Sequence, residues 1–370
     1  MTNKEALLFV GKCLSLSMHP ECASSIKATI LSGQIDWRQV VYQSSAQFVL
    51  PALYLNLKRN NLLSDLPEDL VAHFEEITNL NRERNQSIIK QLNNINALLN
   101  ENGLKPVFLK GTAHLLDGLY EDIGERMIGD IDFLLEENEA LQAFNILKEN
   151  GYYRLSKIGD AVIGAGRHLP RLINENEIAA VEVHGQMLKT KQNYIFNWLM
   201  VEKNLKEAKN LKDAFVLSDN DLILNNMLNV LLNDKGKSML KIFLRQNYDL
   251  LLLSKRENPS AASRSFNRNH KDLNAYIALS AHLFDYPATL NFEENTSAKH
   301  YLQKINFVWD YPRLARFGRL IYFIFFRIYR YFVTLIGFFV SSSTRKRVIA
   351  SLSDPTYYGK HFEQYKVWFS

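Results

Sequence analysis

The chain has 370 residues and a mass of 42.8 kDa, which exceeds one ordinary domain of about 150 residues and predicts two or three modules. Hydrophobic residues make up 47% and charged residues 22%, a composition that excludes a disordered chain. The net charge of +5 excludes a basic coating over the whole surface. With two cysteines, Cys13 and Cys22, a disulfide framework and a four-cysteine zinc site are also excluded, and we expect both to pack as small apolar residues in a reducing compartment.

Residues 1–103 are predicted to form a helical N-terminal region. Apolar residues recur at three- and four-residue spacing, and the pattern restarts at Pro51. A long helix is expected to begin at Asp65 or Pro67 and to end before Gly103. Because the first residues lack the long apolar core of a signal peptide, we expect a cytoplasmic protein.

The pattern changes in residues 104–190, where short apolar strands alternate with helices and predict a compact α/β core. A loop with Gly159, Gly164 and Gly166 is expected before the last strand. The predicted elements are a strand at 106–109, a helix at 113–119, a strand at 131–135, a helix capped by Asn138 and ending at Gly151, and strands at 152–155 and 178–184.

Helical patterns return in residues 191–303, interrupted by a polar stretch, Glu257–His270, that is predicted to be a loop or flexible joint. Residues 304–370 form a separate basic and aromatic C-terminal helical segment. The predicted fold class is therefore α+β, with a small mixed-sheet core flanked by N- and C-terminal helical regions.

Two predicted strands carry polar residues at alternate positions. Side chains two apart in a strand share a face, so Asp130 and Asp132 project together, as do Glu182 and His184. If the two strands pair, three carboxylates converge, and such a cluster requires a cation. Carboxylate oxygens suit Mg²⁺ or Mn²⁺, and two such ions about 4 Å apart can stabilise an in-line phosphoryl transfer.

A candidate phosphate-binding loop precedes these strands. Gly111 and Thr112 join a strand to a helix start, where free backbone N–H groups and the helix dipole favour an anion. Gly111 permits close backbone approach, and Thr112 adds a hydroxyl. Lys110 and Arg126 are candidate ligands of phosphate oxygens, although Arg126 can instead pair with Glu125 or Asp130.

These residues resemble a known family. The segments FLKGTAHLLDGLYEDIGERMIGDIDFLL, AFNILKENGYY, RHLPRL and VEVHG are similar to the LKG…R…DIDLLV…GY…ELH pattern of the bacterial "uncharacterised nucleotidyltransferase" family. That family falls within the DNA polymerase beta-like nucleotidyltransferase superfamily. The resemblance covers Leu104–Leu188 and implies metal ligands at Asp130, Asp132 and Glu182, with Glu182 alternatively acting as a base. Gly111-Thr112 would match the family's phosphate loop.

The resemblance implies an enzyme that moves a nucleoside monophosphate from an NTP to an acceptor, releasing pyrophosphate. It does not fix the acceptor, for which a small molecule, glycan or peptide ranks above a nucleic acid. Eighteen residues separate Gly111 from Asp130, a gap longer than is usual in the superfamily but shared by the narrower family. Two alternatives stay open, a non-catalytic nucleotide- or partner-binding protein of the same fold and an RNA-modifying nucleotidyltransferase.

Three further polar residues have weaker claims on function. His168 lies on a predicted loop that can cover the site, and His184 is either a catalytic or a hydrogen-bonded structural histidine. Asp249 lies in an apolar helix and is expected to contact Arg245, four residues before it.

The C-terminal segment, 313–347, raises a membrane question because residues 320–340 approach the length of a bilayer span, about 20 residues. Arg327 and Arg330 lie inside this stretch, and each would cost about 2.5–3.5 kcal/mol near the bilayer centre. On a helical wheel, Arg316, Arg327 and Arg330 share one narrow side with Arg319 and Thr334.

This pattern leaves three interpretations open: contact with an anionic membrane surface or a lipid-linked ligand, packing within the protein, and a true span. Aromatic residues here can also stack on the bases of RNA, namely Tyr322, Phe325, Phe326 and Tyr329. Residues 304–347 carry nine basic and one acidic side chain, a local charge of +8, so the remaining 326 residues carry −3. We therefore expect any membrane or polyanionic partner to bind this segment.

Overall fold

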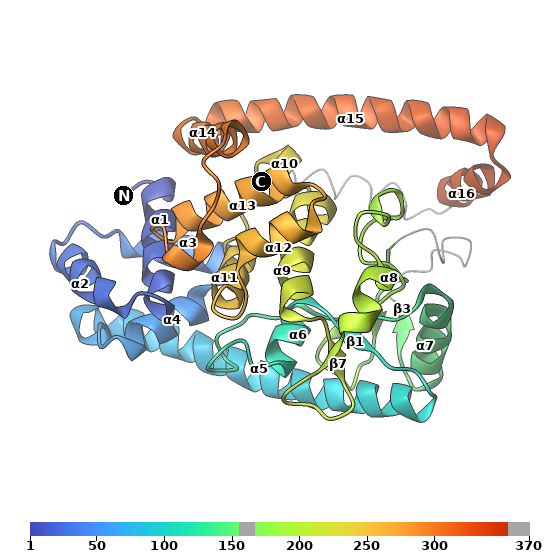
Figure 1. Cartoon of the computed structure of the whole chain (residues 1–370), viewed down its shortest axis with the longest axis horizontal. Coiled ribbons are helices and arrows are strands. Elements are labelled where there is room, and N and C mark those ends of the chain that lie inside the picture. The colour runs from blue at the N-terminus through green and yellow to red at the C-terminus, as the bar shows by residue number, and fades with distance from the viewer. Residues whose placement is uncertain (155–166, 354–370) are drawn as a thin grey trace. The chain divides into compact units, whose positions relative to one another are not determined.

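A computed structural model describes residues 1–154 and 167–353 of the chain (Figure 1). These residues form two compact units, one of residues 1–154 with 167–310 and one of residues 311–353. The predicted loop with Gly159, Gly164 and Gly166 lies outside the described residues. Cys13 is buried and Cys22 is half-buried, and both thiols are free, as predicted.

The N-terminal region is helical, as predicted. Thr2 caps the first helix through a reciprocal capping box with Glu5. Pro51 lies in the first turn of the fourth helix, which confirms the expected restart, and Gly103 ends the fifth helix in the left-handed region with a φ of 76°. The helices are α1 (Asn3–Leu14), α2 (Ala23–Leu31), α3 (Trp37–Ala46), α4 (Leu50–Arg59) and the long α5 (Glu68–Glu101).

One mixed sheet of seven strands forms the core of the described chain, in the order β3-β4-β5-β2-β1-β7-β6. Its central strands β2 and β5 are parallel, whereas β1 pairs antiparallel with β2 on the other side. The strands are β1 (Val107–Phe108), β2 (Asp130–Leu134), β3 (Tyr153–Arg154), β4 (Leu172–Ile173), β5 (Ala180–His184), β6 (Lys206–Glu207) and β7 (Phe215–Val216). The predicted α+β class is therefore confirmed.

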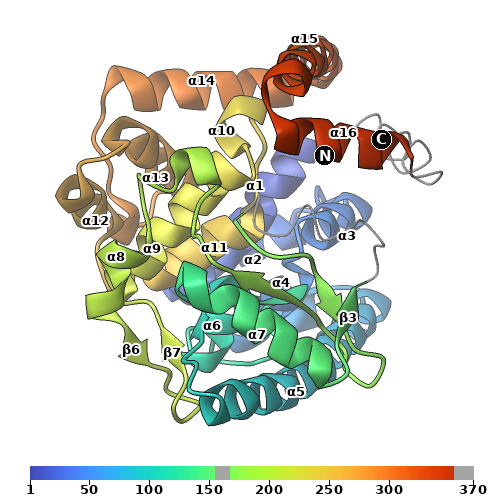
Figure 2. The same ribbon diagram turned by 90° about the vertical axis from the view of Figure 1, so that its right-hand side faces the viewer.

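Two helices connect these strands. The first, α6 (Lys110–Leu116), begins three residues before the predicted helix and packs against β2. The second, α7 (Glu137–Glu149), packs against β5, and Figure 2 shows it in front of the sheet region. Its N-cap is Glu136, so the prediction of Asn138 as the cap was wrong. Acidic residues in the first turn, which favour a helix start through the helix dipole, extend α7 toward its N-terminus.

Helices again dominate after the sheet. The predicted loop at Glu257–His270 is wrong, because Asn258 caps a helix by accepting a hydrogen bond from the Ala261 amide, and Pro259 suits its first turn. One side of that helix carries small side chains, and this side is buried. The elements are α8 (Trp198–Val201), α9 (Asp219–Leu228), a π-helical turn (Asn229–Asn233), α10 (Gly236–Met239), α11 (Leu244–Leu253), α12 (Pro259–Phe266), α13 (His270–Leu283) and α14 (Thr296–Asp310).

The second unit contains α15 (Pro312–Val340) and α16 (Ser342–Leu352). Among the described residues, α15 is the one helix whose length and composition would suffice to cross a membrane, with a mean hydropathy of 1.7 over its most apolar stretch. None of that stretch is buried.

Gly11 offers a test of how the first unit is assembled. Helix α1 packs against α13 so closely that a Cβ added at Gly11 would lie 2.0 Å from the Leu283 carbonyl oxygen. We expect Gly11→Ala to lower the free energy of unfolding by at least about 1–3 kcal/mol, because backbone must move to relieve the overlap. Urea unfolding measures this change, with Gly129→Ala as control, since nothing lies within 4 Å of a Cβ there. Equal stability of both variants would contradict this close packing of α1 against α13.

Candidate active site

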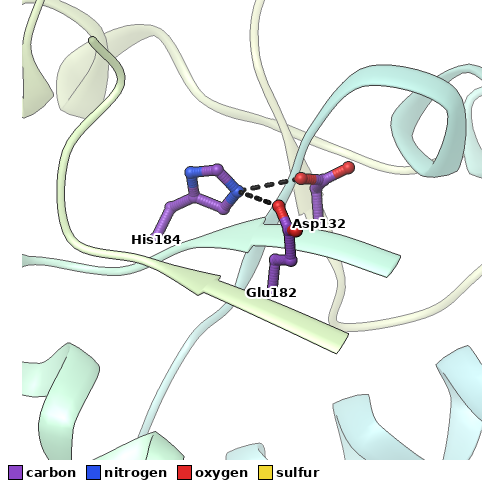
Figure 3. A group of neighbouring side chains, drawn as sticks. All are labelled: Asp132, Glu182 and His184. Atoms are coloured by element: carbon purple, nitrogen blue, oxygen red, sulfur yellow. Dashed lines mark hydrogen bonds and ion pairs between the residues drawn. The ribbon is translucent and has the colours of Figure 1, made fainter. Parts of the chain in front are cut away.

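The parallel pairing of β2 with β5 builds the site. Asp132 lies directly opposite Glu182, and His184 ends the same strand two residues later, as the alternation of side chains predicted. One possible ligand atom from each of these three side chains lies within 4.8 Å of the other two (Figure 3). The predicted pairing of the two strands is thus present, but it brings together two carboxylates and a histidine rather than the three carboxylates that we expected.

His184 is the inner member of this group. Its side chain is buried, and Nε2 lies 2.8 Å from Asp132 Oδ1 and 3.7 Å from Glu182 Oε2. Burial lowers the pKa of His184 to about 4, although the neighbouring Asp132 acts in the opposite direction. Burial also opposes ionisation of Asp132, but Lys110 and His184 outweigh it and hold the pKa of Asp132 well below its usual range. Asp132 is therefore a carboxylate beside a neutral imidazole at pH 7.

Asp130 belongs to the site but not to the close group of three. Its carboxylate forms an ion pair with Arg171, whose Nε also lies 3.4 Å from Glu182 Oε1. His168 lies on the same side, with Nε2 4.0 Å from Glu182 Oε2, and its backbone forms a bridge to His184. His168 therefore lies beside Glu182, and its functional role stays a prediction. Sequence reasoning missed Arg171, although the segment RHLPRL contains it.

The predicted phosphate loop lies beside these carboxylates. Lys110 has left-handed backbone geometry, with a φ of 53°, and its ammonium group contacts Asp132. The Thr112 hydroxyl is buried and donates to the carbonyl oxygens of Leu109 at 2.7 Å and Asp132 at 3.2 Å. Thr112 therefore fixes the loop to the strand that carries Asp132, while Gly111 faces the adjacent cavity.

A cavity of about 190 Å³ opens next to Asp130 and Asp132. One wall comes from the sheet region and its loops, and the other from α9, α11 and the π-helical turn. π-helical turns are rare and often occur at functional sites. The cavity is rich in basic and amide groups, contributed by Lys110, Arg126, Arg167, Arg245, Asn225, Asn226, Asn229 and Gln246.

Arg126 forms a buried, two-bonded ion pair with Asp249 of α11. Its Nε and a terminal nitrogen each lie 2.7 Å from a different carboxylate oxygen, and the Tyr120 hydroxyl donates to the same carboxylate. The expectation that Asp249 contacts Arg245 was wrong, because Arg126 arrives from the loop before β2 and occupies the carboxylate. Burial disfavours the charged form of Asp249, but Arg126 outweighs burial and lowers its pKa.

Arg245 instead faces the cavity without a carboxylate partner. One terminal nitrogen donates to the Met127 carbonyl at 2.8 Å, and the guanidinium lies 5.0 Å from the centre of the Phe48 ring. Its Nε is buried without a hydrogen-bond partner, and Arg245 makes no ion pair with another described residue. Burial, followed by repulsion from Arg126, lowers its pKa to about 10. Arg245 as a whole is half-buried, so its buried Nε lacks a hydrogen bond that an anion entering the cavity can supply.

Side chains from α5 hold the irregular segment that precedes β2. The amide of Asn81 donates to the Gly124 carbonyl at 2.7 Å, and that of Asn85 donates to the Arg126 carbonyl at 2.8 Å. Farther along α5, Gln91 accepts from the Ala179 amide and donates to its carbonyl, next to the start of β5. Both acidic strands are therefore positioned by one helix. Periodicity alone gave no signal for this role, because the side chains are polar.

The comparisons with known proteins agree with this geometry. A family model described as Uncharacterised nucleotidyltransferase matches residues 33–283, more than half of the chain. The match includes α5, the whole sheet and the cavity. No significant match is found among curated proteins.

His114, on the cavity wall, makes stability depend on pH. It is buried 3.8 Å from Asp249, and burial lowers its pKa from 6.5 to about 4, while Asp249 and Arg126 act in opposite directions. Between about pH 6.5 and 4, His114 is therefore protonated in the unfolded chain but neutral in the folded chain. Its contribution to the free energy of unfolding is fully present above about pH 6.5 and is lost as the pH falls toward 4. We expect His114 to account for a loss of about 3 kcal/mol over that window.

Denaturant unfolding at several pH values measures this slope. His114→Gln should show a shallower loss of stability between pH 6.5 and 4 than the natural protein, whereas His73→Gln, an exposed site on α5, should not change the slope. Identical slopes for the natural protein and His114→Gln would contradict the assignment.

Proposed function

This chain belongs to the Uncharacterised nucleotidyltransferase family, and from that membership we propose that it transfers a nucleoside monophosphate from an NTP to an unidentified acceptor, in a metal-dependent reaction. The acceptor would be a small molecule, a glycan or a peptide. The observation that carries the proposal is the register of β2 and β5, which sets Asp132 opposite Glu182 beside a cavity lined by basic, acidic and amide side chains.

The side chains present fit a divalent cation. Asp132 and Glu182 offer carboxylate oxygens, His184 offers an imidazole nitrogen, and Asp130 lies on the same strand face as Asp132. Oxygen donors suit Mg²⁺ or Mn²⁺, and the nearby imidazole is compatible with Mn²⁺. Asp130, Asp132 and Glu182 would hold the metal. Such an ion, when bound, neutralises negative charge that develops on phosphoryl oxygens.

The reaction follows from the placement of charged groups around the cavity. An acceptor oxygen attacks the α-phosphorus, the bond from that phosphorus to the bridging oxygen breaks, and pyrophosphate leaves. The proton of a hydroxyl acceptor passes to Glu182, a half-buried carboxylate. Lys110 and Arg245 bind phosphate oxygens, and Gly111 permits the close approach of the nucleotide. Catalysis by these residues consists mainly of positioning and charge neutralisation.

Arg245 gives independent support for an anionic substrate. Arg245 is half-buried and has no ionic partner among the described residues, so it gains a charge-assisted hydrogen bond when phosphate enters. Arg126, by contrast, is already neutralised by Asp249. Arg126 therefore shapes the cavity wall, and Arg245 is the better candidate for the phosphate contact.

A second candidate function, binding without catalysis, has its own support. Each carboxylate of the site already has a basic neighbour, Lys110 for Asp132 and Arg171 for Asp130 and Glu182. A protein that only recognises a nucleotide can keep such pairs permanently. Catalysis requires that Lys110 and Arg171 yield the carboxylates to a metal, so the dependence of NTP binding on Mn²⁺ or Mg²⁺ separates the two functions.

Removal of the facing carboxylates tests the proposed reaction. We expect Asp132→Asn with Glu182→Gln to abolish metal-dependent pyrophosphate release, measured with each of the four NTPs and a fractionated mixture of acceptors, because the charge that holds the cation is gone. Transfer of label from α-³²P-labelled NTP to an acceptor provides the second readout.

The matched control is Glu76→Gln with Glu83→Gln, which removes two exposed carboxylates from α5. Circular dichroism and the unfolding midpoint establish that both double variants fold. Full activity of the Asp132 and Glu182 variant would refute the site. Metal-independent NTP binding without pyrophosphate release in the natural protein would favour the binding function.

Substitution of Arg245 tests the phosphate contact. We expect Arg245→Ala to raise the Kd for a non-hydrolysable NTP by about 10- to 150-fold, the loss expected for a hydrogen bond to a charged group. Arg245→Lys should retain part of the affinity, because it keeps the charge but not the planar fork. Calorimetry measures both values, and an unchanged Kd for Arg245→Ala would exclude the contact.

A further inference from the structure

Residues 311–353 have an unusual charge composition. They contain eight basic residues and no acidic residue, and five of the eight are arginines of α15. The remainder of α15 is almost wholly aliphatic and aromatic. A helix of this composition attracts negatively charged partners over the range of a Debye length, about 8–10 Å at ordinary ionic strength.

The arginines of α15 lie on one side of the helix. At 100° per residue, they fall within an arc of about 120°. These residues are Arg313, Arg316, Arg319, Arg327 and Arg330. The opposite side contains no charged residue, and its large side chains are exposed, with Phe325 68% and Phe339 70% accessible. The exposed members of this apolar side also include Phe317, Ile321, Ile328, Phe332 and Leu335.

From this arrangement we propose that α15 lies in the headgroup region of an anionic lipid bilayer, parallel to the surface. Its apolar side enters the boundary of the acyl chains, and its arginines bind lipid phosphates. Exposed aromatic side chains opposite a cationic stripe are the composition that interfacial helices require. The basic residues of α16, which begins two residues after α15 ends, add to the same attraction.

The spread of the arginines favours this orientation over a membrane span. Arg313 and Arg330 lie about 26 Å apart along the helix axis, at 1.5 Å per residue. A helix that crosses the bilayer with residues 320–340 would place Arg327 and Arg330 inside the hydrocarbon region, where a guanidinium is unfavourable. A helix parallel to the surface holds all five at one depth, beside the phosphates.

The lack of acidic residues also decides between lipid and a second copy of the chain. A dimer formed through the apolar side of α15 would bring two cationic helices together, with no carboxylate on α15 or α16 to neutralise them. An anionic bilayer supplies that neutralisation, and it covers the exposed aromatic side chains at the same time.

Vesicle flotation of the full chain tests the proposal. We expect binding to vesicles of phosphatidylcholine with about one-third phosphatidylglycerol, little binding to pure phosphatidylcholine, and a decrease as salt rises. The variant Arg316→Glu, Arg327→Glu, Arg330→Glu should bind more than about tenfold more weakly. Replacement of Phe325, Phe332 and Phe339 by Ser should also weaken binding, which a purely ionic contact would not show.

The matched control reverses three exposed lysines of the first unit, Lys148, Lys209 and Lys212, to Glu, and should bind as the natural chain does. Equal losses in the control and the arginine variant would overturn the proposal, since total charge would then govern binding. If alkaline carbonate does not release the bound natural chain and the arginine variant binds equally well, α15 spans the membrane and the proposal is overturned. The proposal is also overturned if the chain does not float with vesicles and light scattering shows a dimer. These readouts do not involve nucleotide, so they are independent of the proposed reaction.

Discussion

The cavity depends on the buried ion pair between Arg126 and Asp249. The two residues are 123 positions apart, and their contact joins the loop before β2 to helix α11. Breaking a buried pair by removing one partner leaves an uncompensated charge, which typically destabilises a protein by about 3–5 kcal/mol. The pair therefore fixes the distance between the acidic strands and the wall of helices that faces them. Tyr120 adds a third group to this junction.

Charge is organised differently inside the site and in the second unit. At the site, most carboxylates form ion pairs with basic side chains. A substrate must therefore replace some of these ion pairs in order to bind. Arg245 and Arg167 are the exceptions among the cavity cations, because neither forms an ion pair with a described residue. In α15 and α16 all charge is of one sign, and on α15 it lies along one side of an otherwise apolar helix. A ligand of the site must therefore replace ion pairs that already exist, whereas α15 and α16 would bind through attraction to a negatively charged surface.

Much of the site could be predicted from the sequence, because strand periodicity is a local property. Side chains two residues apart in a strand lie on the same face, so the sequence predicted a shared face for Asp130 and Asp132 and another for Glu182 and His184. This prediction did not require knowing which strands pair. Pairing of β2 with β5 then brought Asp132, Glu182 and His184 together. Partners that come from distant segments could not be predicted in this way. The contact of Asp249 with Arg126 rather than Arg245 depends on tertiary packing, and so does the placement of Arg171 between two carboxylates.

The same distinction explains the results for the fold. The long helix α5 was predicted because its pattern, its Pro67 start and its Gly103 end all agree. The helix α12 was missed because Ser, Asn and Arg dominate its composition, and the cap at Asn258 outweighed that composition. Local start signals proved more informative there than average polarity.

The row of amides along α5 has a consequence for which changes in the length of this helix the fold can tolerate. Asn81 and Asn85 bind the loop before β2, and Gln91 binds the start of β5, so the two contacts are separated by a fixed number of helical turns. Inserting or deleting one residue between them would rotate one end by about 100° relative to the other and shift it by about 1.5 Å. One acidic strand would then lose its anchor. The five residues between Asn85 and Gln91 should thus tolerate substitution on their exposed side but no change in number, because their number sets the spacing of the two strands.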